Sequence, residues 1–207
     1  MFSNIPFPSL FVCFLIFCAW LHYEKRKATR EDMRASKEFW QRESEANASR
    51  NKDISHLPFF ELDEAQIPLS QTDDENICYY QEKVRGCLAL PMMNLSGYTN
   101  TDLKLSFGIG NFKTLSSYDE NYNSFLINLS NLGKAYHMAG LLSEAEKTYL
   151  LCLDSGSDKA IDYLALADIY HESNDDKKLT ALIDRVETSD LPRKESLLSR
   201  IRSKVIL

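Results

Sequence analysis

The chain has 207 residues, enough for one domain or for a small domain with appendages, and 44% of them are hydrophobic, an ordinary fraction for a folded protein. Seven glycines and six prolines are few, which favours helices over a turn-rich β-sandwich. The formal net charge of −6 argues against a dedicated nucleic-acid-binding protein, which needs a basic surface for phosphates. We therefore expect an all-α fold and no nucleic-acid partner.

An apolar stretch without a charged side chain occupies residues 5–23. Nineteen residues of helix, at about 1.5 Å per residue, extend roughly 28 Å, close to the thickness of a hydrocarbon core. A cleaved signal peptide is the alternative, but no Lys or Arg precedes the stretch and its end is a poor cleavage site. We predict a single transmembrane helix here, which places the protein in a cell membrane.

The residues that follow this stretch are strongly polar. Four basic residues lie between positions 25 and 30, and by the positive-inside rule they place the C-terminal body in the cytoplasm. Residues 24–52 contain neither Gly nor Pro and are rich in charge, which predicts a polar juxtamembrane helix. Its two adjacent aromatic residues, Phe39 and Trp40, are expected to dock on the protein's own body or on a partner, and the body is the favoured site.

The middle of the chain, residues 53–118, reads as a connector followed by helices that pack on the C-terminal part. Prolines and an aromatic patch in residues 53–71 predict an extended segment. A cap at residues 72–74 begins a helix that continues to about Ala89. A second cap at residues 99–101 begins a short helix, which the glycines from Gly108 end.

Residues 126–159 and 160–193 read as two versions of one 34-residue pattern. Aligned pairs include Leu132 with Leu166, Tyr136 with Tyr170, and His137 with His171. A period of this length indicates a helical repeat, in which each unit is a pair of antiparallel helices and needs neighbours to bury its apolar face. We place the repeat domain at residues 119–192.

The first unit carries small and aromatic residues at characteristic spacings. They are Leu132, Gly133, Tyr136, Gly140, Ala145 and Tyr149. With these residues the unit resembles the tetratricopeptide repeat (TPR). The second unit departs from the pattern, with Ala167 and Asn174 at the two glycine positions and Leu179 at the small-residue position. The resemblance implies a short α-α superhelix in which Gly133 and Ala145 allow close helix approach.

Residues 193–207 predict a final helix with Leu197, Leu198 and Ile201 on one face, suited to capping the repeat. The whole chain also resembles uncharacterised single-pass, membrane-anchored TPR proteins of Gram-positive anaerobic bacteria. The segments that carry this resemblance are residues 38–47, 52–55 and 100–105, which precede the repeat. It implies an architecture and a location but no activity.

The TPR resemblance also implies which residues line a concave groove. In the first unit they are Ile127, Ser130, Lys134, His137 and Met138, and in the second Ile161, Leu164, Asp168, His171 and Glu172. Equivalent histidines of stacked units lie too far apart to share one ion easily, so we expect a groove-lining role and no metal. No cofactor motif is present: the glycines at 108 and 110 do not continue into a nucleotide-binding pattern.

No nucleophile, base or metal set typical of an enzyme is found in the sequence, so we expect no catalysis. The leading hypothesis is a membrane-tethered TPR scaffold or adaptor that binds a protein or peptide partner in its groove. The alternative is a self-associating structural membrane protein, a homo-oligomer, whose groove is filled by its own middle segment.

Overall fold

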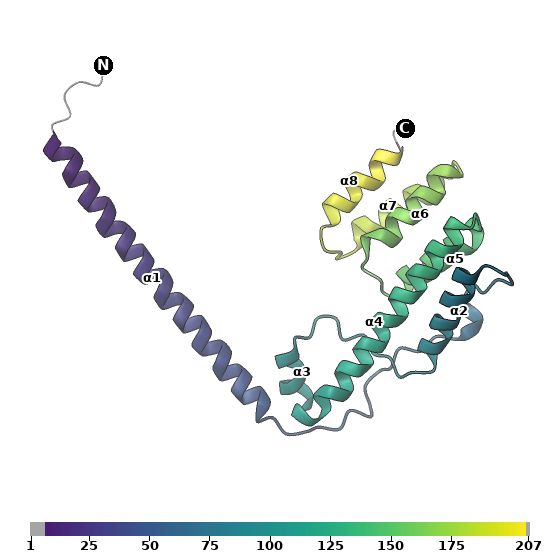
Figure 1. The fold of residues 1–207 in the computed structure, drawn as a ribbon, viewed down its shortest axis with the longest axis horizontal. Coiled ribbons are helices and arrows are strands. Elements are labelled where there is room, and N and C mark those ends of the chain that lie inside the picture. The colour runs from purple at the N-terminus through teal and green to yellow at the C-terminus, as the bar shows by residue number, and fades with distance from the viewer. Residues whose placement is uncertain (1–6, 206–207) are drawn as a thin grey trace, which may run out of the picture. The chain divides into compact units, whose positions relative to one another are not determined.

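The structure is a computed structural model that describes residues 7–205. Within that range the chain forms eight α-helices and one short 3₁₀ helix, and no strand occurs among these residues. The prediction of an all-α fold is confirmed. The chain divides into two compact units (Figure 1): unit 1 comprises the residues up to Ser55 with Gly97–Phe112, and unit 2 comprises His56–Ser96 with the residues from Lys113 onward.

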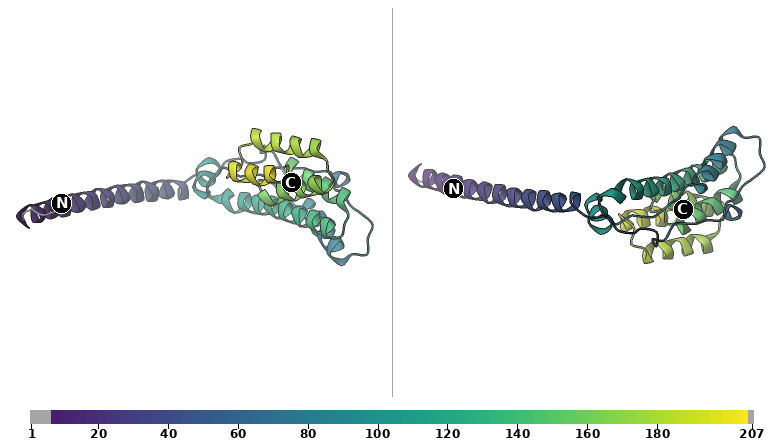
Figure 2. Two further views of the ribbon diagram at one scale, coloured as in Figure 1. Left: turned by 90° about the horizontal axis from the view of Figure 1, so that it is seen from above. Right: turned by 90° about the horizontal axis from the view of Figure 1, so that it is seen from below.

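Unit 1 is built on one long helix, α1 (Phe7–Asn47), which is continuous in every view (Figures 1 and 2). The sequence assigned residues 5–23 to a membrane span and residues 24–52 to a polar helix; the structure has one helix through both stretches, and it ends at Asn47. No helix breaker lies near residue 23, so the helix does not pause there. At the other end the Ser49 hydroxyl lies 2.6 Å from the carbonyl oxygens of both Ala46 and Lys104, a local bonding pattern that competes with further helix.

The structure lends no support to the predicted membrane span at residues 5–23. Among the described residues, no helix is both long enough and apolar enough to cross a bilayer. A crossing needs about 20 predominantly apolar residues, and charged side chains begin at Glu24 within the same helix. Residues 5 and 6 of the predicted span lie outside the described range.

The second helix of unit 1, α3 (Asn100–Phe107), begins at Thr99, whose hydroxyl caps the first turn as the sequence predicts. Charged contacts tie α3 to the end of α1. Glu43 pairs with Lys104 and accepts a 2.6 Å hydrogen bond from the Thr101 hydroxyl. The hydrogen bonds from Lys104 and then Thr101 hold the pKa of the Glu43 carboxyl below its ordinary value. The carboxylate is therefore charged at neutral pH and holds the two helices together.

Phe39 and Trp40 lie on the outer surface of α1 and contact each other edge to face, with ring centroids 5.3 Å apart. Their exposed fractions are 56% and 65%. Neither ring is covered within unit 1, and both predictions, docking on the protein's own body or on a partner, stay open. Two adjacent exposed aromatic side chains are typical of an interaction surface.

Unit 2 contains the repeat. Its helices are α4 (Ile109–Met138, from Lys113 onward), α5 (Leu142–Asp154), α6 (Ala160–Glu172), α7 (Asp176–Thr188) and α8 (Lys194–Val205). Helix α7 begins and ends 34 residues after α5, and α6 ends 34 residues after α4. The turns repeat at the same offset, with positive φ angles of 75° at Gly140 and 55° at Asn174. Successive helices from α5 to α8 pack against one another (Figure 1).

Helix α4 differs from the predicted layout because it has no break at residue 119 or 126. It is one helix of 30 residues whose N-terminal half precedes the first repeat unit. No Pro, and no Gly between positions 110 and 133, interrupts this stretch. The buried Leu115, Tyr122 and Phe125 continue the apolar face into the repeat, so the helix extends without interruption.

The core of unit 2 joins the helices of both repeat units. Leu132 and Tyr136 of α4 have no exposed surface, and a Cβ atom placed on Gly133 would lie 3.0 Å from the Tyr149 ring. This close approach of α4 and α5 is what the small residue was expected to permit. Helix α8 adds three buried side chains, Leu197, Leu198 and Ile201, to the same core.

The segment of unit 2 that precedes the repeat packs on α4 through aromatic side chains. The Phe60 ring contacts those of Tyr122 and Phe125, with centroids 5.2 Å and 5.6 Å apart. Helix α2 (Glu75–Leu88) begins at Asp74, whose carboxylate accepts the Ile77 N–H. The short 3₁₀ helix (Glu64–Gln66) lies between these two features.

Tyr136 connects this segment to the repeat. Its hydroxyl donates to the Pro68 carbonyl at 2.7 Å and accepts hydrogen bonds from the Ser70 N–H and from Gln81 Nε2. Tyr136 is completely buried, so these three bonds satisfy its polar atom within the core. The tyrosine expected to fill the repeat therefore also fixes the preceding segment in place.

Candidate binding groove

A cavity of about 490 Å³ lies in unit 2 and is lined mainly by α4 and α6, with one residue each from α5, the turn before α6 and α8. Seven of the residues predicted to line the groove border it: Ile127, Ser130, Lys134, His137, Ile161, Leu164 and Asp168. Three come from each repeat at equivalent positions, since α4 and α6 are the first helices of the two units. A volume of this size falls in the range of about 300–1,000 Å³ typical of small ligand sites.

Three predicted residues do not line this cavity. Met138 is 78% exposed at the last position of α4, and His171 and Glu172 are exposed at the end of α6. All three occupy the final turn of their helix, as does His137, which borders the cavity. His137 borders the cavity but His171 does not, so the structure separates the two equivalent histidines.

Five further lining residues were not predicted: Asn131, Tyr149, Lys159, Ala165 and Arg200. Asn131 and Ala165 are neighbours of predicted residues on the same helices. Lys159 precedes α6, and Arg200 belongs to α8, so neither lies on a first helix of a repeat unit. Their positions depend on how the turn and the last helix pack, which the repeat pattern does not specify. None of the described lining residues comes from residues 53–118.

A buried carboxylate lies beneath the groove. Asp162, in the first turn of α6, has no exposed surface. Its two oxygens accept hydrogen bonds from the hydroxyls of Ser130 on α4 and Ser157 on the preceding turn, the latter at 2.7 Å. A buried charge of this kind is costly unless hydrogen-bonded. The bonds explain how Asp162 is tolerated and join the two repeat units directly under the cavity.

The charge of Asp162 affects the neighbouring side chains. Burial, and after it the negative charge of Asp162, raise the pKa of the Tyr149 hydroxyl well above its ordinary value. The same two causes raise the pKa of the buried Cys152 thiol. Both groups are neutral at physiological pH, so neither adds a charge beside Asp162. Cys152 is completely buried and packs as a core residue.

Helix α8 closes one side of the groove. Asp168, the only carboxylate among the lining residues, forms an ion pair with Lys204 of α8. Arg200, one turn earlier on the same helix, borders the cavity. The helix predicted to cap the repeat therefore also supplies part of the candidate site, and it neutralises the one acidic side chain in the cavity wall.

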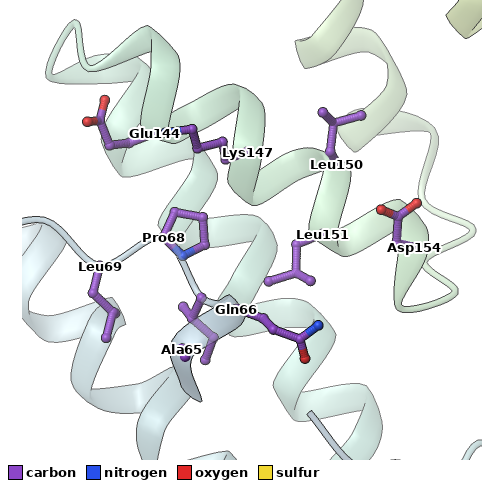
Figure 3. Close-up of a pocket in the computed structure, with 10 residues that line it drawn as sticks. Ala65, Gln66, Pro68, Leu69, Glu144, Lys147, Leu150, Leu151 and Asp154 are labelled. Atoms are coloured by element: carbon purple, nitrogen blue, oxygen red, sulfur yellow. The ribbon is translucent and has the colours of Figure 1, made fainter. Parts of the chain in front are cut away.

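A second cavity, of about 510 Å³, lies on the other helix of the first repeat unit, between α5 and the segment of residues 65–69 (Figure 3). Pro68 and Leu69 line it from the segment, Leu151 points from α5 toward that segment, and Glu144 and Asp154 lie toward opposite ends of α5. This cavity is a seam where the chain's own segment already packs on the repeat. We therefore take the cavity between α4 and α6 as the candidate site.

Comparison with known proteins finds no matching family model, no matching curated protein and no matching solved structure. The TPR resemblance of the two repeat units therefore stays a prediction. The functional argument depends on the geometry of the groove itself.

Proposed function

We propose that this protein is a membrane-tethered helical-repeat scaffold of the TPR type that holds a protein or peptide partner in the groove between α4 and α6. The observation that carries the proposal is the cavity bordered by seven residues that were selected from the sequence as groove-lining. Its wall combines apolar side chains such as Ile161 and Leu164 with polar ones, a mixture suited to recognising a peptide. The sequence shows no residue set typical of an enzyme, so binding is the activity that we propose.

Filling the groove tests this function. We expect Ala165→Trp, which places a large ring in the cavity, to reduce recovery of partner proteins by roughly tenfold, the equivalent of about 1.4 kcal/mol. The matched control is Ala181→Trp, at an exposed position of α7 outside the cavity. Partners are measured by quantitative mass spectrometry after affinity purification of the full chain in mild detergent. Equal recovery by both variants, with unchanged thermal melting, would rule out binding at this groove.

Membrane attachment through residues 5–23 is the second part of the proposal. It is supported by the exposure of every side chain from Phe11 to Tyr23, in a stretch dominated by large apolar residues. A helix that is apolar all around is normally surrounded by protein or lipid. The basic residues between positions 25 and 30 favour a cytoplasmic location for the rest of the chain.

Alkaline extraction of membranes tests the attachment. We expect the full chain to stay in the membrane pellet and Phe14→Asp/Phe17→Asp to be released, since each buried Asp costs about 2.5–3.5 kcal/mol. The control, Met33→Asp/Ala36→Asp, adds the same charges farther along α1 and is expected to stay in the pellet. Release of the unmodified chain would contradict the proposal.

Self-association is the alternative, and the exposed pair Phe39 and Trp40 is the observation that favours it. Such a pair on a helix surface could meet the same pair of a second copy. The other part of that alternative, a groove filled by the middle segment, has less support because residues 53–118 contribute nothing to the described cavity wall. Analytical ultracentrifugation of the full chain in detergent tests this alternative by measuring its oligomeric state. A strict monomer rules out self-association.

A further inference from the structure

The charge of the groove is opposite to that of the protein. The whole chain has a formal net charge of −6, yet the cavity is bordered by three basic side chains, Lys134, Lys159 and Arg200. Its only lining carboxylate, Asp168, is already paired with Lys204, and the buried Asp162 is bonded to two hydroxyls beneath the wall. The surface offered to a ligand is therefore positive in an acidic protein.

These three cations have no counter-ion within the part of the chain that the structure describes: none of them forms an ion pair within 4.0 Å. Other basic residues of the repeat do, since Lys178 pairs with Glu146 and Arg185 with Asp154. Three unpaired cations around one cavity repel each other unless an anion is bound between them. Their placement thus favours a negatively charged ligand.

Apolar side chains lie beside these cations. Ile127 and Ile161 are 49% and 61% exposed at equivalent positions of α4 and α6, and both border the cavity. Asn131 also lines the cavity and makes no side-chain hydrogen bond within the described structure, so its amide is free to bind a main-chain group. A ligand that satisfies all three features carries carboxylates, apolar side chains and a peptide backbone.

We propose that the occupant of the groove is an acidic peptide segment of a partner protein, in which Asp or Glu residues alternate with large apolar ones. Lys134, Lys159 and Arg200 bind its carboxylates, and Ile127 and Ile161 contact its apolar side chains. This inference rests on the proposed function, because it names the class of partner that the same groove binds. A nucleic acid would supply negative charge as well, but not the apolar side chains that the two isoleucines require.

Selection from a random-peptide phage library on the full chain in detergent micelles tests the inference. We expect groove-dependent binders, defined as those lost on Ala165→Trp, to be enriched in Asp and Glu. A synthetic peptide from this set should bind Lys134→Glu/Arg200→Glu at least about tenfold more weakly, since each reversal removes an attraction and adds a repulsion. Its affinity should also fall as salt is raised.

The control variant is Lys113→Glu/Lys177→Glu, which makes the same charge change at two exposed lysines outside the cavity and should bind the peptide as the unmodified chain does. The same peptide with Lys in place of its acidic residues should recover binding to Lys134→Glu/Arg200→Glu. Groove-dependent peptides without acidic enrichment, or equal weakening by both charge variants, would overturn the acidic-peptide inference and leave the binding function standing. The absence of any groove-dependent peptide would instead overturn the proposed function itself.

Discussion

Replacing Leu132 by alanine is expected to lower the free energy of unfolding by about 2–5 kcal/mol. Leu132 has no exposed surface and belongs to the core that joins α4 to the helices of both repeat units. Truncation removes buried methyl groups and leaves a cavity that the neighbouring helices can refill only in part. The effect is large because a chain with two repeat units has few other contacts that could maintain the fold.

Urea unfolding of the full chain in detergent, followed by the loss of helical circular dichroism, measures this change. Leu90→Ala provides the matched control, because Leu90 is 48% exposed in the turn after α2. Surface substitutions of that kind usually change stability by less than about 0.5 kcal/mol. A midpoint for Leu132→Ala that coincides with the control would show that residue 132 lies outside the stabilising core.

Much of this core could be predicted because the repeat places equivalent residues in equivalent environments. The 34-residue offset located Leu132 and Leu166, and both are completely buried. It also located the turns, since Gly140 and Asn174 have the left-handed backbone that a tight helix connection requires. Periodicity is informative here because each match is supported by a second copy of the same pattern.

Other parts of the fold depend on contacts between distant segments, which one sequence does not reveal. Nothing local indicates that α1 ends at Asn47, because its end is set by bonds from Ser49 and Glu43 to the region of α3. The exposure of Trp40 is equally a property of the packing. Apolar residues in a polar helix suggest burial, but they do not say which surface covers them.

The groove residues likewise divide into those that the sequence could predict and those that it could not. Residues on the first helix of each unit could be placed by the repeat, and most of them line the cavity. Lys159 and Arg200 could not, because they approach from a turn and from the last helix. Asp162 was also missed, since an acid in the first turn of a helix ordinarily caps it in solvent. Its burial follows from the two serine hydroxyls, one of them on another helix.

Asp162 leads to the second large effect: Asp162→Ala is expected to destabilise the fold by about 2–4 kcal/mol. Hydrogen bonds to a charged group contribute about 1.5–3 kcal/mol each, and the hydroxyls of Ser130 and Ser157 would both lose their acceptor. Ser157 is only 3% exposed, so water cannot readily replace the carboxylate there. Removing a buried charge recovers part of this loss, which keeps the expected total below the sum of two such bonds.

A double-mutant cycle with Ser130→Ala separates this bond from the other effects of the substitution. We expect a coupling of about 0.5–3 kcal/mol between the two positions, because the hydroxyl has little to stabilise once the carboxylate is gone. Asp158→Ala, at an exposed acid in the turn before α6, is the control and should change stability little. If the stability changes of the two single substitutions simply add in the double variant, the hydrogen bond between Ser130 and Asp162 does not stabilise the fold. Since Ser130 also borders the groove, a measured coupling would show that the contact joining the two repeat units also supports the wall where the partner is proposed to bind.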